Sequence, residues 1–180
     1  MGTIPLNRRL LSLGLEAALM VFVLGHAPRV AADDTPLFRV RSSDQAIAQF
    51  IELAAARSLT FRNLVAVIQG SDGIVYVEPG ECGHGTRACL KLWMGTSGST
   101  RFLRVVVNRR RAYSDADFMG SIGHELQHTV EALSEPNTVN SMRLYNYFTR
   151  TAISGPRFET MEAITAGDAV RHELRDLHAR

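Results

Sequence analysis

Residues 115–133 of this 180-residue chain read DADFMGSIGHELQHTVEAL. Apolar side chains recur in this stretch at intervals of three and four residues, which is the pattern of an amphipathic helix. Ser114 precedes the stretch as a candidate helix cap, and Pro136 follows it. The stretch therefore predicts one long helix with a continuous apolar face. That face consists of Phe118, Met119, Ile122, Leu126, Val130 and Leu133.

The middle of this helix carries His124-Glu125-Leu126-Gln127-His128. Residues four apart lie on one face of a helix, one turn from each other, so the two imidazoles can bind the same metal ion. Glu125 stands beside the first histidine, where a carboxylate can act as general base toward a water on that ion. Chance alone produces H-E-x-x-H in about one of a hundred chains of this composition. The motif predicts a hydrolytic zinc site that needs a third ligand from the protein.

The third ligand is expected among the acidic residues that follow the motif. Glu131 shares the face of His128 but lies two turns beyond His124, so an outer contact or a surface position suits it better. Glu159 and Glu162 stand where the last helix is expected to begin, near residue 157 or 158. Asp168 comes later and is expected to face less inward.

Glu159 is favoured because a stripe of small and apolar residues follows it on one helix face. Small residues allow two helices to approach closely, and an acid at the head of that face can then point at the histidines. Glu162 and Glu131 remain the alternative ligands. The stripe consists of Ala163, Gly167, Val170 and Leu174.

The rest of the chain predicts an α+β fold with a small, mainly antiparallel sheet. Short links between three β-rich segments favour a three-stranded meander packed on the long helix. A cap at Ser43 or Asp44 and another at Thr60 predict two helices before the sheet. The expected helices are residues 43–57, 60–69, 115–133, 139–151 and 157–177, and the expected strands are residues 74–78, 90–94 and 102–107.

The segment Ile122–His128 on its helix after a small sheet resembles the active-site helix of the zincin metallopeptidases. A glutamate from a following helix resembles the gluzincin branch, whose third ligand carries over to Glu159. The metzincin extension with a third histidine is absent, and so is the N-E-x-x-S-D form, because Phe158 and Ala163 occupy its Asn and Ser places. The chain thus looks like a small, diverged member of the clan.

This resemblance implies a zinc peptidase in which His124, His128 and Glu159 bind Zn²⁺ and Glu125 is the general base. It also implies that a strand edge, here residues 102–107, holds a peptide or protein substrate by main-chain pairing. Tyr145 and Tyr147 are the candidate oxyanion donors. The alternative is a non-catalytic, zinc-stabilised binding module on the same scaffold, although such a module has no need of Glu125.

The two cysteines both lie in the segment ECGHGTRAC, residues 81–89. In an exported protein, the spacing of Cys82 and Cys89 favours a disulfide that closes a small loop between the ends of two neighbouring strands. A metal site of Cys82, His84 and Cys89 is the weaker alternative, because the second ligand pair of a structural zinc site is missing.

The N-terminus predicts a secretory signal peptide, residues 1–32, with a basic start, an apolar stretch and small residues before Asp33. The localisation expected is periplasmic or extracellular, with membrane attachment only if this segment stays uncleaved. Residues 33–180 then form a single domain with 17 basic and 17 acidic side chains. This balance does not suggest a nucleic-acid partner, and the run Arg109–Arg111 is expected to be a solvated loop.

Overall fold

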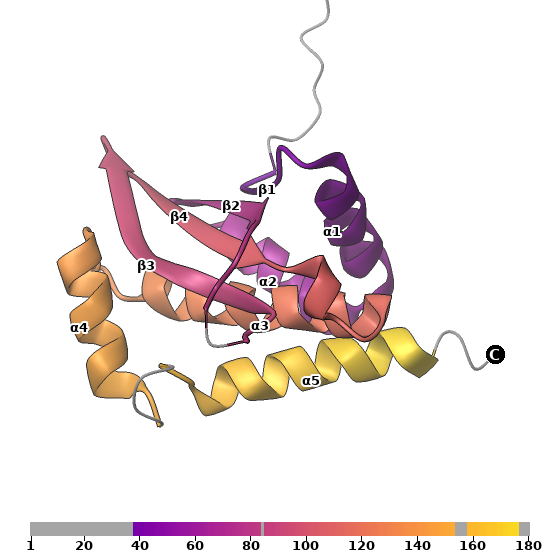
Figure 1. Ribbon diagram of the computed structural model, residues 1–180. Helices are drawn as coiled ribbons and strands as arrows, with labels where there is room; N and C mark the ends of the chain where they lie inside the picture. The colour runs from indigo at the N-terminus through magenta and orange to yellow at the C-terminus, as the bar shows by residue number, and fades with distance from the viewer. Residues whose placement is uncertain (1–37, 84, 154–157, 177–180) are drawn as a thin grey trace, which may run out of the picture. The chain divides into compact units, whose positions relative to one another are not determined.

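Four strands form one mixed sheet in the order β1-β2-β4-β3 (Figure 1). The computed structural model describes residues 38–83, 85–153 and 158–176, all within the unit that spans residues 37–180. The expected signal peptide, residues 1–32, lies outside the described residues. The strands are β1 (Val40–Arg41), β2 (Gly73–Pro79), β3 (Ala88–Ser97) and β4 (Thr100–Val107).

The α+β class is confirmed, whereas the expected antiparallel meander is wrong. Only β3 and β4 pair antiparallel, while β2 pairs parallel with both β1 and β4. The physical reason lies in the two links. Gly98, with φ +55°, closes a tight turn that forces β3 and β4 into a hairpin. The longer link from β2 to β3 leaves room for β4 to insert between them, so β4 is central and β3 is the edge.

Five helices accompany the sheet in the described part of the chain. Side-chain caps set their starts: Asp44, Ser114 and Asn140 each accept a backbone N–H three residues on. The second helix is capped by Ser58, not by the expected Thr60. The helices are α1 (Gln45–Arg57), α2 (Leu59–Gln69), α3 (Asp115–Ser134), α4 (Ser141–Thr151) and α5 (Met161–Asp176), with a 3₁₀ turn η1 (Arg109–Arg111) before α3.

Helix α3 is the centre of the core. Its apolar face packs toward the sheet and α2, and α5 runs alongside it (Figure 1). Burying one large apolar side chain contributes about 1.5–3 kcal/mol to the stability of the fold. Because α3 buries several such side chains at the centre of the core, its packing organises the domain. No helix of the described residues has the length and apolar character needed to cross a membrane. Fully buried side chains include Phe61, Val75, Leu103, Phe118, Ile122, Leu126 and Phe148.

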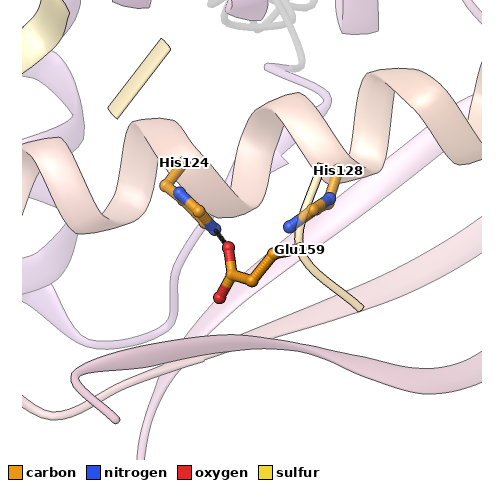
Figure 2. Close-up of side chains that lie close together, drawn as sticks. All are labelled: His124, His128 and Glu159. Atoms are coloured by element: carbon orange, nitrogen blue, oxygen red, sulfur yellow. Dashed lines mark ion pairs between the residues drawn. The ribbon is translucent and has the colours of Figure 1, made fainter. Parts of the chain in front are cut away.

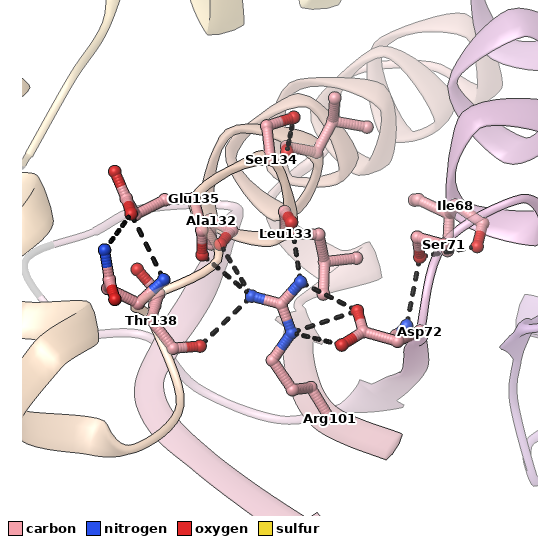
Figure 3. A network of polar contacts seen from close by, with 12 residues as sticks. Ile68, Ser71, Asp72, Arg101, Ala132, Leu133, Ser134, Glu135 and Thr138 are labelled. Atoms are coloured by element: carbon pink, nitrogen blue, oxygen red, sulfur yellow. Dashed lines mark hydrogen bonds and ion pairs between the residues drawn. The ribbon is translucent and has the colours of Figure 1, made fainter. Parts of the chain in front are cut away.

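The C-terminal end of α3 is held by Arg101 at the start of β4 (Figure 3). Its guanidinium donates to the carbonyls of Ala132, Leu133, Glu135 and Thr138 at 2.6–3.3 Å and forms an ion pair with Asp72 at 2.7 Å. The last carbonyls of a helix have no partner within it, and here a single 5%-exposed arginine satisfies two of them together with two carbonyls of the following segment. Arg101 therefore fixes the helix against the sheet.

Helices α3 and α5 approach closely because glycines face each other. A Cβ on Gly167 would lie 3.0 Å from Cβ of His124 and 3.1 Å from the carbonyl oxygen of Gly120. The expected packing role of the stripe is thus confirmed, since Ala163, Val170 and Leu174 are also buried. The close approach sets the depth at which His124 sits.

The change Gly167→Ala is expected to destabilise the protein by about 1–3 kcal/mol, because the added methyl group pushes on the backbone of α3. Helix propensity alone would make the alanine variant more stable. A loss of stability would therefore show that the close packing of α3 and α5 outweighs propensity. Urea unfolding followed by circular dichroism measures it. Gly70→Ala is the control, since its Cβ would meet only ordinary contacts at 3.6 Å. Equal stability of the Gly167→Ala and wild-type proteins would contradict the prediction.

Candidate metal centre

Three of the expected ligands come together at one point. His124 and His128 project from the same side of α3, and Glu159 lies opposite them (Figure 2). Nε2 of His124 is 3.1 Å from Oε2 of Glu159, and one potential ligand atom from each of the three residues lies within 4.8 Å of the others. Two imidazoles and a carboxylate in this arrangement can hold a metal ion.

Glu159 reaches this point from a turn, not from a helix. Helix α5 begins at Met161, two residues after Glu159, because the Thr160 side chain accepts the N–H of Ala163 and caps the helix there. Phe158 has φ +52°, a left-handed conformation that is costly for a bulky residue. The backbone N–H of Ile153 donates to the carbonyl of Glu159 at 2.8 Å. These features fix the turn that directs Glu159 at His124.

His128 is oriented by two neighbours. Its Nδ1 lies 3.0 Å from Oε2 of Glu131, and the hydroxyl of Thr160 donates to the other oxygen of Glu131 at 2.8 Å. With Nδ1 in contact with this carboxylate, Nε2 is the ring nitrogen left to bind a metal. Phe148 packs edge-on against the ring, with centroids 5.3 Å apart. Glu131 thus makes the outer contact that the sequence favours and does not replace Glu159.

Glu125 lies on the same helix with its carboxylate turned toward the sheet. It is only 7% exposed, and Oε2 accepts the backbone N–H of Leu90 at 2.7 Å. Burial raises the pKa of the Glu125 carboxyl, opposed by the nearby His124 and His128 and by the Leu90 N–H. Burial alone would lower the pKa of His124, but the hydrogen bond to Glu159 and the charge of Glu125 outweigh it, so that pKa is raised.

The strand beside the site is β3, which corrects the expectation for residues 102–107. Those residues belong to β4, which is paired on both sides and has no edge to offer. Strand β3 is the outer strand, and its pairing with β4 is interrupted between Leu90 and Met94 by a bulge. The β3 segment 88–92 faces the histidines, because it lines a cavity together with them.

Two cavities meet at the candidate metal centre. The first, of about 340 Å³, has an apolar wall made by Leu90, Leu92, Phe148 and Phe158. The second, of about 470 Å³, has a polar wall that includes three arginines. Residues common to both are Thr86, Ala88, His124, Glu125 and Glu159. A substrate held at the metal centre would therefore meet chemically different surfaces on its two sides.

The other sequence-based candidates are not among the three converging residues. Glu162 is exposed in the first turn of α5, and Asp168 lies on the wall of the second cavity, where it is exposed and pairs with Arg171. Tyr145 packs edge-on against Phe158, and Tyr147 against Phe148. Within the described residues neither of these two tyrosines lines the two cavities, so the structure does not bring either of them to the centre as an oxyanion donor.

The predicted disulfide between Cys82 and Cys89 is present. It leaves no thiolate for the alternative metal site, whose His84 lies outside the described residues. The bond joins the loop after β2 to the beginning of β3. These two strands are not hydrogen-bonded neighbours as expected, because β4 lies between them.

Sequence reasoning missed two parts of the site. The role of the Leu90 backbone N–H cannot be predicted from a pattern of side chains, because it depends on the place of Leu90 on an edge strand. The arginines of the second cavity come from three separate segments, so no local pattern joins them. Arg111 could have been found through the basic run 109–111, which forms η1 instead of an ordinary loop.

Comparisons of this chain with protein-family models, with curated proteins and with solved structures find no match. The resemblance to the zincin metallopeptidases therefore stays a prediction based on the motif. The function is inferred from the geometry and chemistry of the described residues.

Proposed function

We propose that this protein is a zinc-dependent hydrolase that cleaves peptide bonds. The observation that carries the proposal is the convergence of His124, His128 and Glu159, in a cavity that Glu125 also lines. Two imidazole nitrogens and one carboxylate oxygen form a donor set that suits zinc in catalytic sites, which retain one open position. The zincin resemblance supports the same assignment.

The residues present fit the expected chemistry. His124, His128 and Glu159 would hold the zinc, which when bound polarises a carbonyl and makes water a stronger nucleophile at neutral pH. Glu125 would accept a proton from the attacking water and deliver it to the leaving nitrogen. Glu131 keeps His128 in the tautomer that can bind metal.

Strand β3 supports a peptide as the substrate. Its outer edge near Leu90 runs past the histidines, so an extended peptide laid along it can form main-chain hydrogen bonds. Two N–H groups of this edge are already used, that of Leu90 by Glu125 and that of Met94 by Ser141 at the start of α4. A peptide would therefore pair with the short stretch of β3 between them.

Export is part of the proposal. Disulfides persist mainly in oxidising compartments, and the Cys82–Cys89 bond agrees with that setting. The N-terminal segment with its signal-peptide pattern gives the route. Periplasmic or extracellular proteins and peptides are the substrates that such a location supplies.

Metal analysis of the purified protein tests the proposal. We expect about one zinc per chain, and we expect the double variant His124→Ala/His128→Ala to lose it. Glu159→Ala is expected to weaken zinc binding strongly, because the other nearby carboxylates already have partners: Glu131 contacts His128 and Thr160, and Glu125 accepts from Leu90. His172→Ala, an exposed histidine of α5, is the control and should keep its zinc. Zinc that is absent, or unchanged in the double variant, would overturn the proposal.

A peptide-library digestion with and without chelator separates the hydrolase from the alternative, a zinc-stabilised binding module. The hydrolase cleaves, and the chelator stops it. A binding module holds zinc and cleaves nothing.

A further inference from the structure

Three arginines line the second cavity beside the candidate metal centre: Arg87, Arg111 and Arg171. They come from the start of β3, from η1 and from α5, so the fold, and no local sequence pattern, brings them together. His124, Glu125 and Glu159 line the same cavity. A group held by the arginines would therefore belong to a molecule that also reaches the metal centre.

A buried carboxylate positions two of these arginines. Asp117 has a side chain only 5% exposed, and Oδ2 accepts from Nη1 of Arg87 at 3.0 Å. Nε of Arg171 lies 3.5 Å from the other oxygen of Asp117. The backbone N–H of Tyr113 also donates to Asp117, which fixes the carboxylate further. One carboxylate thus anchors two guanidinium groups at the cavity wall. The three arginines form a local cluster of donors on a wall that also carries Glu125, Glu159 and Asp168.

The remaining acidic partners of the arginines are solvent-exposed. Arg111 has its Nε 3.5 Å from Glu81, whose side chain is 69% exposed. Arg171 also pairs with Asp168, which is 62% exposed. Exposed ion pairs contribute little, so an incoming carboxylate can replace them at small cost. Glu125 and Glu159 are the other acids on the wall, and they are directed at Leu90 and His124.

Among the described residues, the first cavity has no comparable group of arginines in its lining. Its wall is formed by Leu90, Leu92, Phe148 and Phe158, with Lys91 as its basic residue. We propose that the second cavity binds a carboxylate of the substrate, either an acidic side chain or the C-terminal carboxylate, while the first takes an apolar side chain. Arginine matches a carboxylate with paired N–H donors, which makes this recognition specific. The inference rests on the proposed peptidase function and names its substrate class.

Peptide binding tests this inference independently of turnover. Fluorescently labelled peptides of the form Ala-Leu-Leu-Xaa-Ala are titrated into the purified protein in the presence of chelator. Xaa is Glu or Gln, and the C-terminus is free or amidated, so the four peptides separate the two sources of the carboxylate. We expect the carboxylate-bearing peptides to bind about tenfold more tightly than the neutral one, and this difference to shrink in high salt.

Arg111→Gln is the test variant, and its neighbour Arg110→Gln is the matched control. Both arginines are exposed on η1, and only Arg111 lines the cavity. Arg111→Gln is expected to weaken binding of the preferred peptide about fivefold and to leave the neutral peptide unchanged. Arg110→Gln should bind both as the wild type does.

Three results would overturn the inference: equal binding of all four peptides, no binding of any of them, or the same loss in the Arg111 and Arg110 variants. Failure of the hydrolase proposal looks different. In that case zinc or cleavage is missing, while the carboxylate preference and its dependence on Arg111 persist. If the protein cleaves peptides without preferring acidic or C-terminal positions and binds all four peptides equally, the proposed arginine site is refuted while the hydrolase proposal stands.

Discussion

Replacing Glu125 with glutamine is expected to reduce peptide hydrolysis by about 10²–10⁴-fold. The amide has nearly the same shape as the carboxylate and can still accept the N–H of Leu90, but it cannot take a proton from water. Zinc content should stay at the wild-type level, because Glu125 is not among the three converging ligands. Initial rates of peptide cleavage and metal analysis on the same sample measure both effects.

The control for this variant is Glu135→Gln. Glu135 follows α3 and accepts the N–H of Asn137, away from both cavities. Its replacement should leave the rate unchanged. A Glu125→Gln protein that cleaves at the wild-type rate would show that another group is the base. Loss of zinc in that variant would show that its effect is indirect.

Replacing Arg101 with methionine is expected to destabilise the protein by about 3–5 kcal/mol. The change removes a 5%-exposed cation and leaves two carbonyls of α3 and two of the segment that follows it without their donor. Because a domain of this size has only about 5–15 kcal/mol of stability, the variant should lose a large share of it. Urea unfolding followed by circular dichroism measures the loss.

Arg104→Met on the same strand is the matched control. Arg104 pairs with Glu78 at the surface, and its side chain is 48% exposed, so its loss should cost less than about 1 kcal/mol. Arg101→Lys keeps the positive charge but loses the forked donors of the guanidinium. Its stability should therefore lie between those of the Arg101→Met and Arg104→Met variants. Equal stability of the Arg101 and Arg104 variants would mean that the network in Figure 3 contributes little.

Local patterns predicted the helices well because their causes are local. The apolar spacing from Phe118 to Leu133 and the cap at Ser114 set the bounds of α3 within one residue. The order of the strands depends on which distant segments pair, and short links alone suggested the wrong neighbours. Strand β1 has two residues and pairs with β2 from more than thirty positions away, so no local pattern marked it.

The candidate site divides in the same way. His124, Glu125 and His128 follow from spacing on one helix, whereas Glu159 was reached through resemblance and packing. The structure brings Glu159 to the histidines, but from a turn, because Thr160 caps α5 and Phe158 reverses the backbone. The hydrogen bond from Leu90 to Glu125 depends on the bulged edge of β3, and periodicity does not reveal that edge.

The Cys82–Cys89 bond divides the candidate site into two parts. The three converging ligands all lie between residues 124 and 159, outside the loop that the disulfide closes. Thr86 and Ala88, which line both cavities, lie inside that loop. Reduction of the bond would therefore loosen the cavity walls and leave the segments that carry the ligands untouched. Under the proposed function, thiol oxidation would thus act on substrate binding and not on metal binding.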